Sequence, residues 1–386
     1  MPKNNFWNSF INTGLVAWSI ICLAIFMYFP GAISQMQGAS LYDLSTLPEK
    51  LSKISIASYL FNTLIAFVGL AFFSIACISV GMKLASIFHL DERLKNDIHA
   101  LQGILFSTYF LIGNAVFSLI FLTLASLSYL SRSLSIIILC LGIFSGIAQF
   151  RKLSIPAVHS KTNYEKVIAI LSLAILVVSL FQSSSRISYD ASAVYFSDAK
   201  LTALLNHVGF YLENTFLVSV FHSVIQFTAV MQVFGDQSAR MIPWLFGVVN
   251  IVIVLELARL VGTSTLTRRI LPILILTSTA FLDQMGDGKV ELFSSAYSLA
   301  AIYWMTMNMN SQRSQQNLFL FFFAGSFLGF ACILRPYNVF LLGIFILAYT
   351  TQQIKAGRFS LPQAVQYIAW ISLGASGFAV YHLLMN

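Results

Sequence analysis

The sequence predicts an all-α, polytopic membrane protein with about eleven transmembrane helices. Of its 386 residues, 58% are hydrophobic and only 9% are charged, and the mean hydropathy is +0.81. Apolar runs of about 20 residues recur along the chain, which is enough helix to cross a hydrocarbon core of about 30 Å. Backbone groups in lipid must satisfy their hydrogen bonds internally, and runs this long are not typical of barrel strands. The spans are therefore predicted to be helices.

The net charge of +8 comes mostly from basic residues in short loops between apolar runs. Membrane topology requires this distribution, so no nucleic-acid partner is expected. The four cysteines lie singly inside apolar runs without a C-x-x-C pair, and they are predicted to be small apolar residues. His207 and His222 lack the spacing of a ligand pair. No metal ligands are assigned, and a divalent cation as cofactor is left open.

The first apolar run, about residues 11–29, follows Lys3 and is too long for a typical signal-peptide core. We therefore expect an uncleaved membrane anchor. The loops 81–99 and 151–166 are rich in Lys and Arg and are predicted to be cytoplasmic, so the span at 167–183 runs outward. The spans expected after the anchor are 57–80, 102–130, 134–150 and 167–183.

The apolar run 215–235 allows two topologies. If it crosses the membrane, the basic segment that holds Arg259, Arg268 and Arg269 lies outside; if it lies along the outer interface, that segment is cytoplasmic. We favour the second topology, with one or two interfacial helices in an external segment of about 184–240. Three polar side chains suit a partly wet helix here: His222, Gln226 and Gln232.

Six further spans are predicted to follow the external segment. The first four spans of the chain carry few buried charges, and the candidate chemistry begins near residue 184. We therefore divide the chain into an N-terminal four-span module, 1–165, and a membrane core, 166–386. Glu256 and Arg259, three residues apart, are interpreted as a local ion pair on one helix. The last six spans are expected at 241–258, 270–283, 292–307, 317–334, 338–354 and 362–384.

Four polar features face the external side in this topology. They are RISYDASAVYFSDAK (186–200), Arg240 at the start of a span, LDQMGDGKVEL (282–292), and Arg335 in ILRPYNVF. Gly286 and Gly288 give the third feature a tight turn. An ionisable group at the edge of a membrane bundle is costly and is a functional candidate by default. The alternative, that a short loop simply needs polar residues, stays open for its acidic and basic side chains.

The order and facing of these pieces resemble the GT-C family of membrane glycosyltransferases over roughly residues 165–350. SYDASAVYF is similar to the first external acidic loop of that family, and GDQSARMIPWLFGVVNIVIVLELARLVG resembles its arginine-led helix. LPILILTSTAFLDQMGDGKVELF is similar to the helix that leads to a second acidic residue. GFACILRPYNVFLL resembles a later helix end that carries Lys or Arg. The likeness is strongest to the protein mannosyl- and aminoarabinose-transferase branch and related bacterial enzymes.

The resemblance implies an enzyme that moves a sugar from a polyprenyl-phosphate donor to a hydroxyl of a lipid, glycan or protein. Its site would face outward from a bacterial inner or cell membrane. A carboxylate beside lipid has a raised pKa and suits a general base, and the planar guanidinium suits a phosphate. Asp190 is the candidate base, with Glu291 or Asp287 orienting acceptor or sugar. The candidate donor-binding residues are Arg240, Lys289, Arg335, Tyr337, Tyr189 and Lys200.

Two functions of other classes remain as alternatives. A transporter or flippase of lipid-linked or small solutes would place acidic residues in mid-span and break helices in paired halves. A non-catalytic scaffold would use the N-terminal spans as an interface. Within the acidic loop, Asp198 is predicted to be secondary to Asp190, because eight residues of helix rise about 12 Å and Lys200 offers Asp198 a surface partner.

Overall fold

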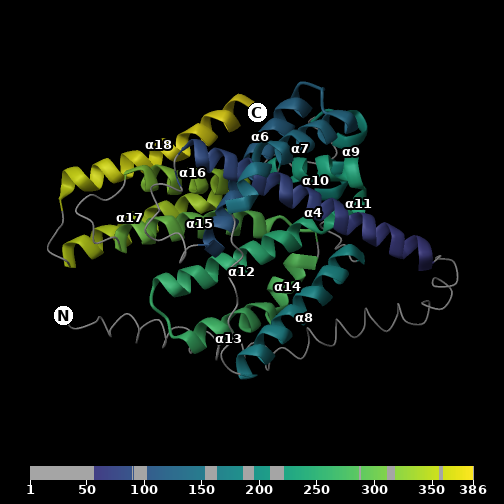
Figure 1. Ribbon diagram of the computed structural model, residues 1–386. Helices are drawn as coiled ribbons and strands as arrows, with labels where there is room; N and C mark the ends of the chain where they lie inside the picture. Colours follow the sequence, from purple (N-terminus) through teal and green to yellow (C-terminus); the bar gives the residue numbers. More distant parts are fainter. Residues whose placement is uncertain are drawn as a thin grey trace, which may run out of the picture.

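The computed structural model describes residues 56–88, 90, 102–152, 163–185, 195–208, 221–286, 288–310, 318–355 and 360–385. Within these ranges the ordered elements are helices and no strand occurs, as predicted (Figure 1). The expected first span, 11–29, lies outside the described residues. So do three predicted site residues: Tyr189, Asp190 and Asp287.

The helices before residue 186 follow the predicted apolar runs. They are α4 (Ile56–Ile87), α6 (Gln102–Ser126), α7 (Arg132–Gly146), the 3-10 helix η2 (Ile147–Lys152) and α8 (Asn163–Ser185). The N-terminus of α7 is capped by Ser131, whose hydroxyl accepts a hydrogen bond from the Leu134 backbone N–H.

The second half of the chain begins with shorter helices and continues into longer ones. The shorter ones are α9 (Ser197–Leu205), α10 (Phe221–Phe234) and α11 (Asp236–Arg240). Gly235, with a positive φ of 88°, makes the turn from α10 to α11. The others are α12 (Ile242–Leu260), α13 (Thr265–Leu276), α14 (Thr279–Gly286), α15 (Glu291–Asn310), α16 (Leu318–Leu334), η4 (Pro336–Asn338), α17 (Val339–Lys355) and α18 (Leu361–Met385).

Five helices in the described residues are long and apolar enough to cross a membrane. They are Phe61–Ile87, Gly103–Ser126, Arg132–Gln149, Lys166–Ser183 and Asp236–Leu260. The count becomes six if α13 and α14, which are bent by 63°, form one broken span. This is consistent with the predicted membrane protein. The larger count of about eleven spans stays a prediction. Most of the additional spans correspond to helices that are shorter or less apolar than these five.

The run 215–235 contains α10, and the structure corrects the surroundings that the sequence predicted for it. His222 is 2% exposed and Gln226 is fully buried. The Gln226 side chain accepts a hydrogen bond from Asn114 at 2.7 Å and donates one to Ser118 at 2.6 Å, both on α6. This helix is therefore not a partly wet surface helix but part of the bundle interior. Whether the run 215–235 crosses the membrane stays a prediction, because residues 215–220 lie outside the described part of the chain.

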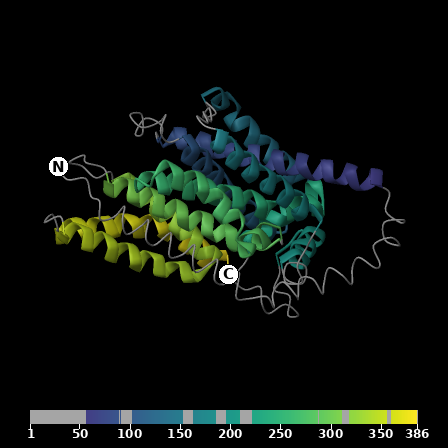
Figure 2. The same cartoon turned by 90° about the horizontal axis from the view of Figure 1, so that it is seen from below.

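Small residues let the longest helices pack backbone to backbone. A Cβ on Gly113 of α6 would lie 1.8 Å from the Cys77 carbonyl oxygen of α4. In the same way, a Cβ on Gly374 of α18 would lie 2.1 Å from the Phe322 carbonyl oxygen of α16. Both views show α16 beside α18 and α15 beside α16 (Figure 1, Figure 2). Close approach at small residues is typical of helix pairs in membranes.

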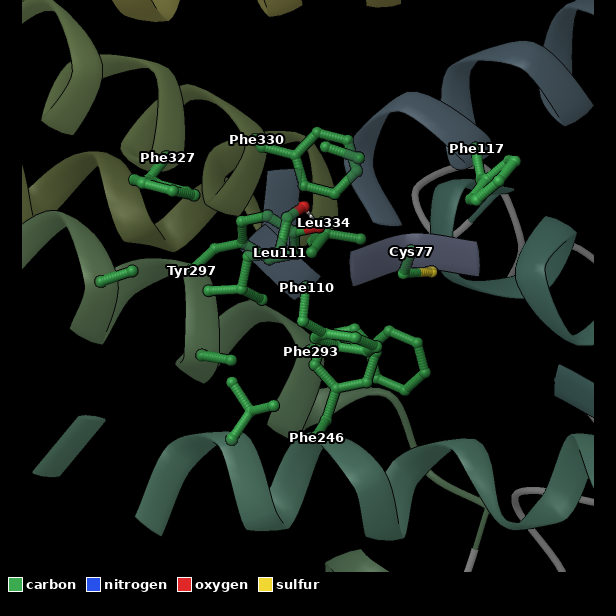
Figure 3. Close-up of a cluster of buried hydrophobic side chains, with 14 of the residues drawn as sticks. Cys77, Phe110, Leu111, Phe117, Phe246, Phe293, Tyr297, Phe327, Phe330 and Leu334 are labelled. Carbon is green, nitrogen blue, oxygen red and sulfur yellow. Dashed lines mark hydrogen bonds between the residues drawn. The ribbon is translucent and has the colours of Figure 1, made fainter. Parts of the chain in front are cut away.

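The centre of the bundle is an aromatic cluster shared by helices from both halves of the chain. Phe246 of α12 stacks on Phe293 of α15 with ring centroids 4.0 Å apart, and Tyr297 of α15 lies 4.5 Å from Phe330 of α16 (Figure 3). The Tyr297 hydroxyl donates to the Leu111 carbonyl oxygen of α6 at 2.8 Å. The proposed boundary near residue 165 stays a prediction, and one apolar core extends across it.

Candidate functional site

The charged side chains of Arg335 and Glu291 meet where α16 ends and α15 begins. The Arg335 Nη2 donates to Glu291 Oε1 at 2.7 Å and to the Tyr195 hydroxyl at 2.9 Å. Pro336 explains why Arg335 leaves the helix: a residue before proline is driven to an extended backbone, and Arg335 has φ −151° and ψ 107°. Glu291 stands in the first turn of α15, where a carboxylate interacts favourably with the helix dipole.

This cluster is partly open to its surroundings. The Arg335 side chain is 20% exposed and that of Glu291 is 37% exposed, while Tyr337 beside them is 58% exposed. Desolvation lowers the pKa of the Arg335 guanidinium, but Tyr195, Glu291 and Tyr337 together outweigh it, and the net pKa is raised. Arg335 therefore remains cationic at every physiological pH.

Arg335 and Glu291 each have one buried polar atom without a hydrogen-bond partner among the described residues. These atoms are the Arg335 Nε and the Glu291 Oε2. A buried donor or acceptor without a partner is costly. The cluster therefore has capacity for one more polar group on each side of the ion pair.

Asn338 fixes the backbone beneath the ion pair. Its side-chain Nδ2 lies 2.6 Å from the Ser294 hydroxyl and 2.9 Å from each of the Ala331 and Arg335 carbonyl oxygens. Its Oδ1 accepts a hydrogen bond from Ser298 at 3.1 Å. Asn338 is 5% exposed, so these bonds are shielded from water. They hold the end of α16 against the first turns of α15 and so set where the Arg335 side chain begins.

Arg240 and Lys200, predicted to share the site, form no direct contact with the Arg335 ion pair among the described residues. The Asn250 Nδ2 of α12 donates to the Leu292 carbonyl oxygen, next to Glu291, at 2.9 Å. Arg240 precedes Asn250 by ten residues of nearly continuous helix, which rise about 15 Å. The Lys200 ammonium forms an ion pair with Asp236 at the start of α11. Lys200 follows Tyr195 by five residues, and the role of both cations beside Arg335 stays a prediction.

The glycine-rich segment 282–292 makes the tight turn that the sequence predicted. Gly288 has a positive φ of 72°, a conformation that favours glycine. A Cβ on Gly286 would lie 3.7 Å from the side chain of Gln182, so the end of α14 packs against the last turns of α8. Lys289 is half-buried in this turn. The turn at 286–288 therefore adjoins the end of the helix that leads to the first predicted external segment.

Two sequence predictions about individual acidic residues have different outcomes. Asp198 was expected at the surface, but it is 3% exposed, because the apolar helix α10 packs against α9. The predicted ion pair of Glu256 and Arg259 is confirmed, with Arg259 Nε donating to Glu256 Oε2 at 2.7 Å.

Sequence reasoning missed Tyr195, Asn338 and the two serines of α15. Tyr195 belongs to the stretch singled out by its charges, but a tyrosine among apolar residues carries no signal of a partner 140 residues away. Asn338 stands three residues after Arg335, and an asparagine within one turn of a helix end is a weak sign of a hydrogen bond to the backbone. Neither signal identifies the partner.

Comparisons with known proteins add no assignment: no family model matches the chain, and searches of curated proteins and of solved structures find no match. Among the described residues, no group of three or more His, Cys, Asp or Glu side chains is placed to hold a metal ion. The site is therefore defined by its own chemistry. It has a fixed guanidinium, a carboxylate and two phenols at the ends of apolar helices, and this set can bind an anionic group.

Proposed function

We propose that this chain is a membrane glycosyltransferase that moves a sugar from a polyprenyl-phosphate donor to a hydroxyl acceptor on the external face. The observation that supports the proposal is the contact of Arg335 with both Glu291 and Tyr195. This contact joins three of the sequence segments on which the resemblance to GT-C enzymes rests. It also places a cation with spare hydrogen-bonding capacity at the end of an apolar helix, where a lipid-borne phosphate would meet it.

The proposed reaction is a displacement at the anomeric carbon of the donor sugar. The acceptor oxygen forms a bond to that carbon while the bond from carbon to the phosphate oxygen breaks, and the phosphate leaves with the bonding electron pair. Asp190, five residues before Tyr195, takes the proton of the acceptor hydroxyl. Arg335 stabilises the charge that develops on the departing phosphate.

The Arg335–Glu291 ion pair has a definite role in this scheme. Without donor, Glu291 neutralises the Arg335 guanidinium. When the donor binds, its phosphate replaces Glu291 in part of the contact with the guanidinium. The freed carboxylate then accepts a hydrogen bond from a sugar or acceptor hydroxyl. Guanidinium binds phosphate through two parallel hydrogen bonds, which a lysine cannot form. Lys289, half-buried in the neighbouring turn, adds positive charge to the same region.

The experiment is mass spectrometry of surface glycans and glycolipids from cells with and without the protein. We expect one species to disappear without it, and to fall strongly in Arg335→Lys and Arg335→Ala cells. Arg259→Lys is the matched control, because Arg259 also pairs with a glutamate at 2.7 Å but on a single helix. Profiles that are identical with and without the protein would contradict the proposal. A change in movement of a lipid-linked solute across vesicles would then favour a transporter.

A further inference from the structure

An apolar cavity of about 210 Å³ lies between the N-terminal helices α4 and α6 and the C-terminal helices α16 and α18. Its inner wall includes Ala115, Tyr297 and Phe330, which are 8%, 0% and 0% exposed. Its outer edge includes Phe88, which is 55% exposed and lies 6.5 Å from Phe319 between ring centroids. The cavity is therefore closed toward the bundle centre and open at the Phe88 edge.

Among the described residues that line this cavity, none offers a polar group to a ligand. The Tyr297 hydroxyl bonds Leu111 and Asn114 instead, and the Ser326 hydroxyl donates to the Phe322 carbonyl oxygen of its own helix at 3.1 Å. The rest of the lining is hydrocarbon and aromatic surface. A cavity of this kind excludes water and accepts apolar molecules; an engineered apolar cavity of about 150 Å³ binds benzene.

The position of the cavity on α16 separates it from the Arg335 cluster. Phe330 precedes Arg335 by five residues and Phe319 by sixteen, so the cavity extends from about 8 to about 24 Å below the ion pair. A five-residue step also turns the helix by about 140°, so these aromatic side chains face away from Arg335. The cavity is a site of its own.

We propose that this cavity holds the end of one acyl chain of a bilayer phospholipid, which enters past Phe88 and Phe319. The candidate span of α4 extends to Ile87, not to residue 80 as the sequence predicted, so Phe88 stands at the end of a span and the opening between apolar helices faces lipid. Phospholipid chains are by far the most concentrated apolar molecules there, and mass action favours them. An empty cavity costs stability in proportion to its volume, so the chain also stabilises the contact between α6 and α16. This inference is independent of the proposed glycosyltransferase activity.

The test uses the full chain in lipid nanodiscs made with a phosphatidylcholine that carries a diazirine at the end of one acyl chain. After illumination, mass spectrometry should find the lipid attached to peptides that contain Phe319–Phe330. Ala115→Phe fills the inner end of the cavity and should reduce that labelling several-fold. Ile120→Phe is the control, because Ile120 is on the same helix but 38% exposed and outside the cavity.

The thermal unfolding of each variant is measured to check that it folds. If Ala115→Phe does not fold, Ser326→Leu takes its place, because Ser326 also lines the cavity. A parallel sample contains a diazirine-bearing isoprenyl phosphate in place of the phospholipid probe. Labelling that is confined to exposed helix faces, or equal in the filled variant and the control, would overturn the proposal. Preferential labelling of the cavity by the isoprenyl probe would overturn the choice of a phospholipid chain.

Discussion

Arg335 and Glu291 form a 2.7 Å ion pair between the end of α16 and the start of α15, although 44 residues separate them in the chain. Both side chains are partly exposed, and ion pairs of this kind contribute only about 0–1 kcal/mol to stability. The helices are held instead by close packing and by the buried side chain of Asn338. The ion pair is therefore free to exchange partners without unfolding the site.

Asn338→Ala should lower the free energy of unfolding by about 1–3 kcal/mol, because the buried hydroxyls of Ser294 and Ser298 on α15 both lose their hydrogen-bond partner. Ser298→Ala removes only a single bond of 3.1 Å to the same side chain and should cost about 1 kcal/mol or less. Thermal unfolding in detergent compares the two variants. An equal effect of both would show that the asparagine is not the centre of the contact.

Gly374→Ala should destabilise the protein and Gly377→Ala should not. A Cβ at residue 374 would lie 2.1 Å from the Phe322 carbonyl oxygen, whereas one at residue 377 meets nothing within 4 Å. Overpacking costs about 1–3 kcal/mol, while alanine in an open helix position gains up to about 1 kcal/mol over glycine. Melting temperatures of the two variants, three residues apart on α18, are compared directly. A stabilised Gly374→Ala would refute the close contact of α16 and α18.

A reporter fused after Thr265 should be cytoplasmic. The prediction rests on the basic residues near this position, which favour the cytoplasmic side. Paired alkaline phosphatase and fluorescent protein fusions measure the side. An active phosphatase at this position would place Arg259 and its neighbours outside and would invalidate the predicted topology.

Asp190→Asn should reduce sugar transfer by roughly 10²–10⁴-fold while leaving expression unchanged, because removal of a general base costs about that much. Asp236→Asn is the control: its carboxylate pairs with Lys200 and is 37% exposed, so its loss should leave transfer near normal. The assay uses membranes and a polyprenyl-phosphate sugar. Near-normal transfer by Asp190→Asn would exclude it as the base.

The apolar helices were predictable because their signal is local: a run of hydrophobic residues of spanning length needs no knowledge of its neighbours. The pairing of Glu256 with Arg259 was predictable for the same reason, since both stand on one helix. The burial of α10 was not, because its glutamine and histidine indicate a wet surface until the Asn114 side chain supplies a partner.

The contacts of the candidate site could not be predicted from the sequence either, because they join residues that are far apart in the chain. Sequence patterns gave Arg335 and Glu291 as candidates, but their contact with each other and with Tyr195 depends on how three helices pack. Arg240 looked equivalent to Arg335 because both stand at helix ends on the predicted external side. Of the two, only Arg335 contacts Glu291 among the described residues, and no sequence pattern indicates which of the two arginines does so.

The most direct test of the central claim exchanges the two charges of the site. Arg335→Glu and Glu291→Arg are made singly and together, and transfer from a polyprenyl-phosphate sugar is measured beside thermal unfolding. The double variant restores an ion pair and should recover part of any loss of melting temperature in the single variants, but not the contribution of the Tyr195 bond or of a carboxylate in the first turn of α15. Because the cation has moved away from the leaving phosphate, its transfer should stay roughly 10²–10³-fold below wild type. Recovery of transfer in the double variant would contradict the account and make the pair a purely structural contact.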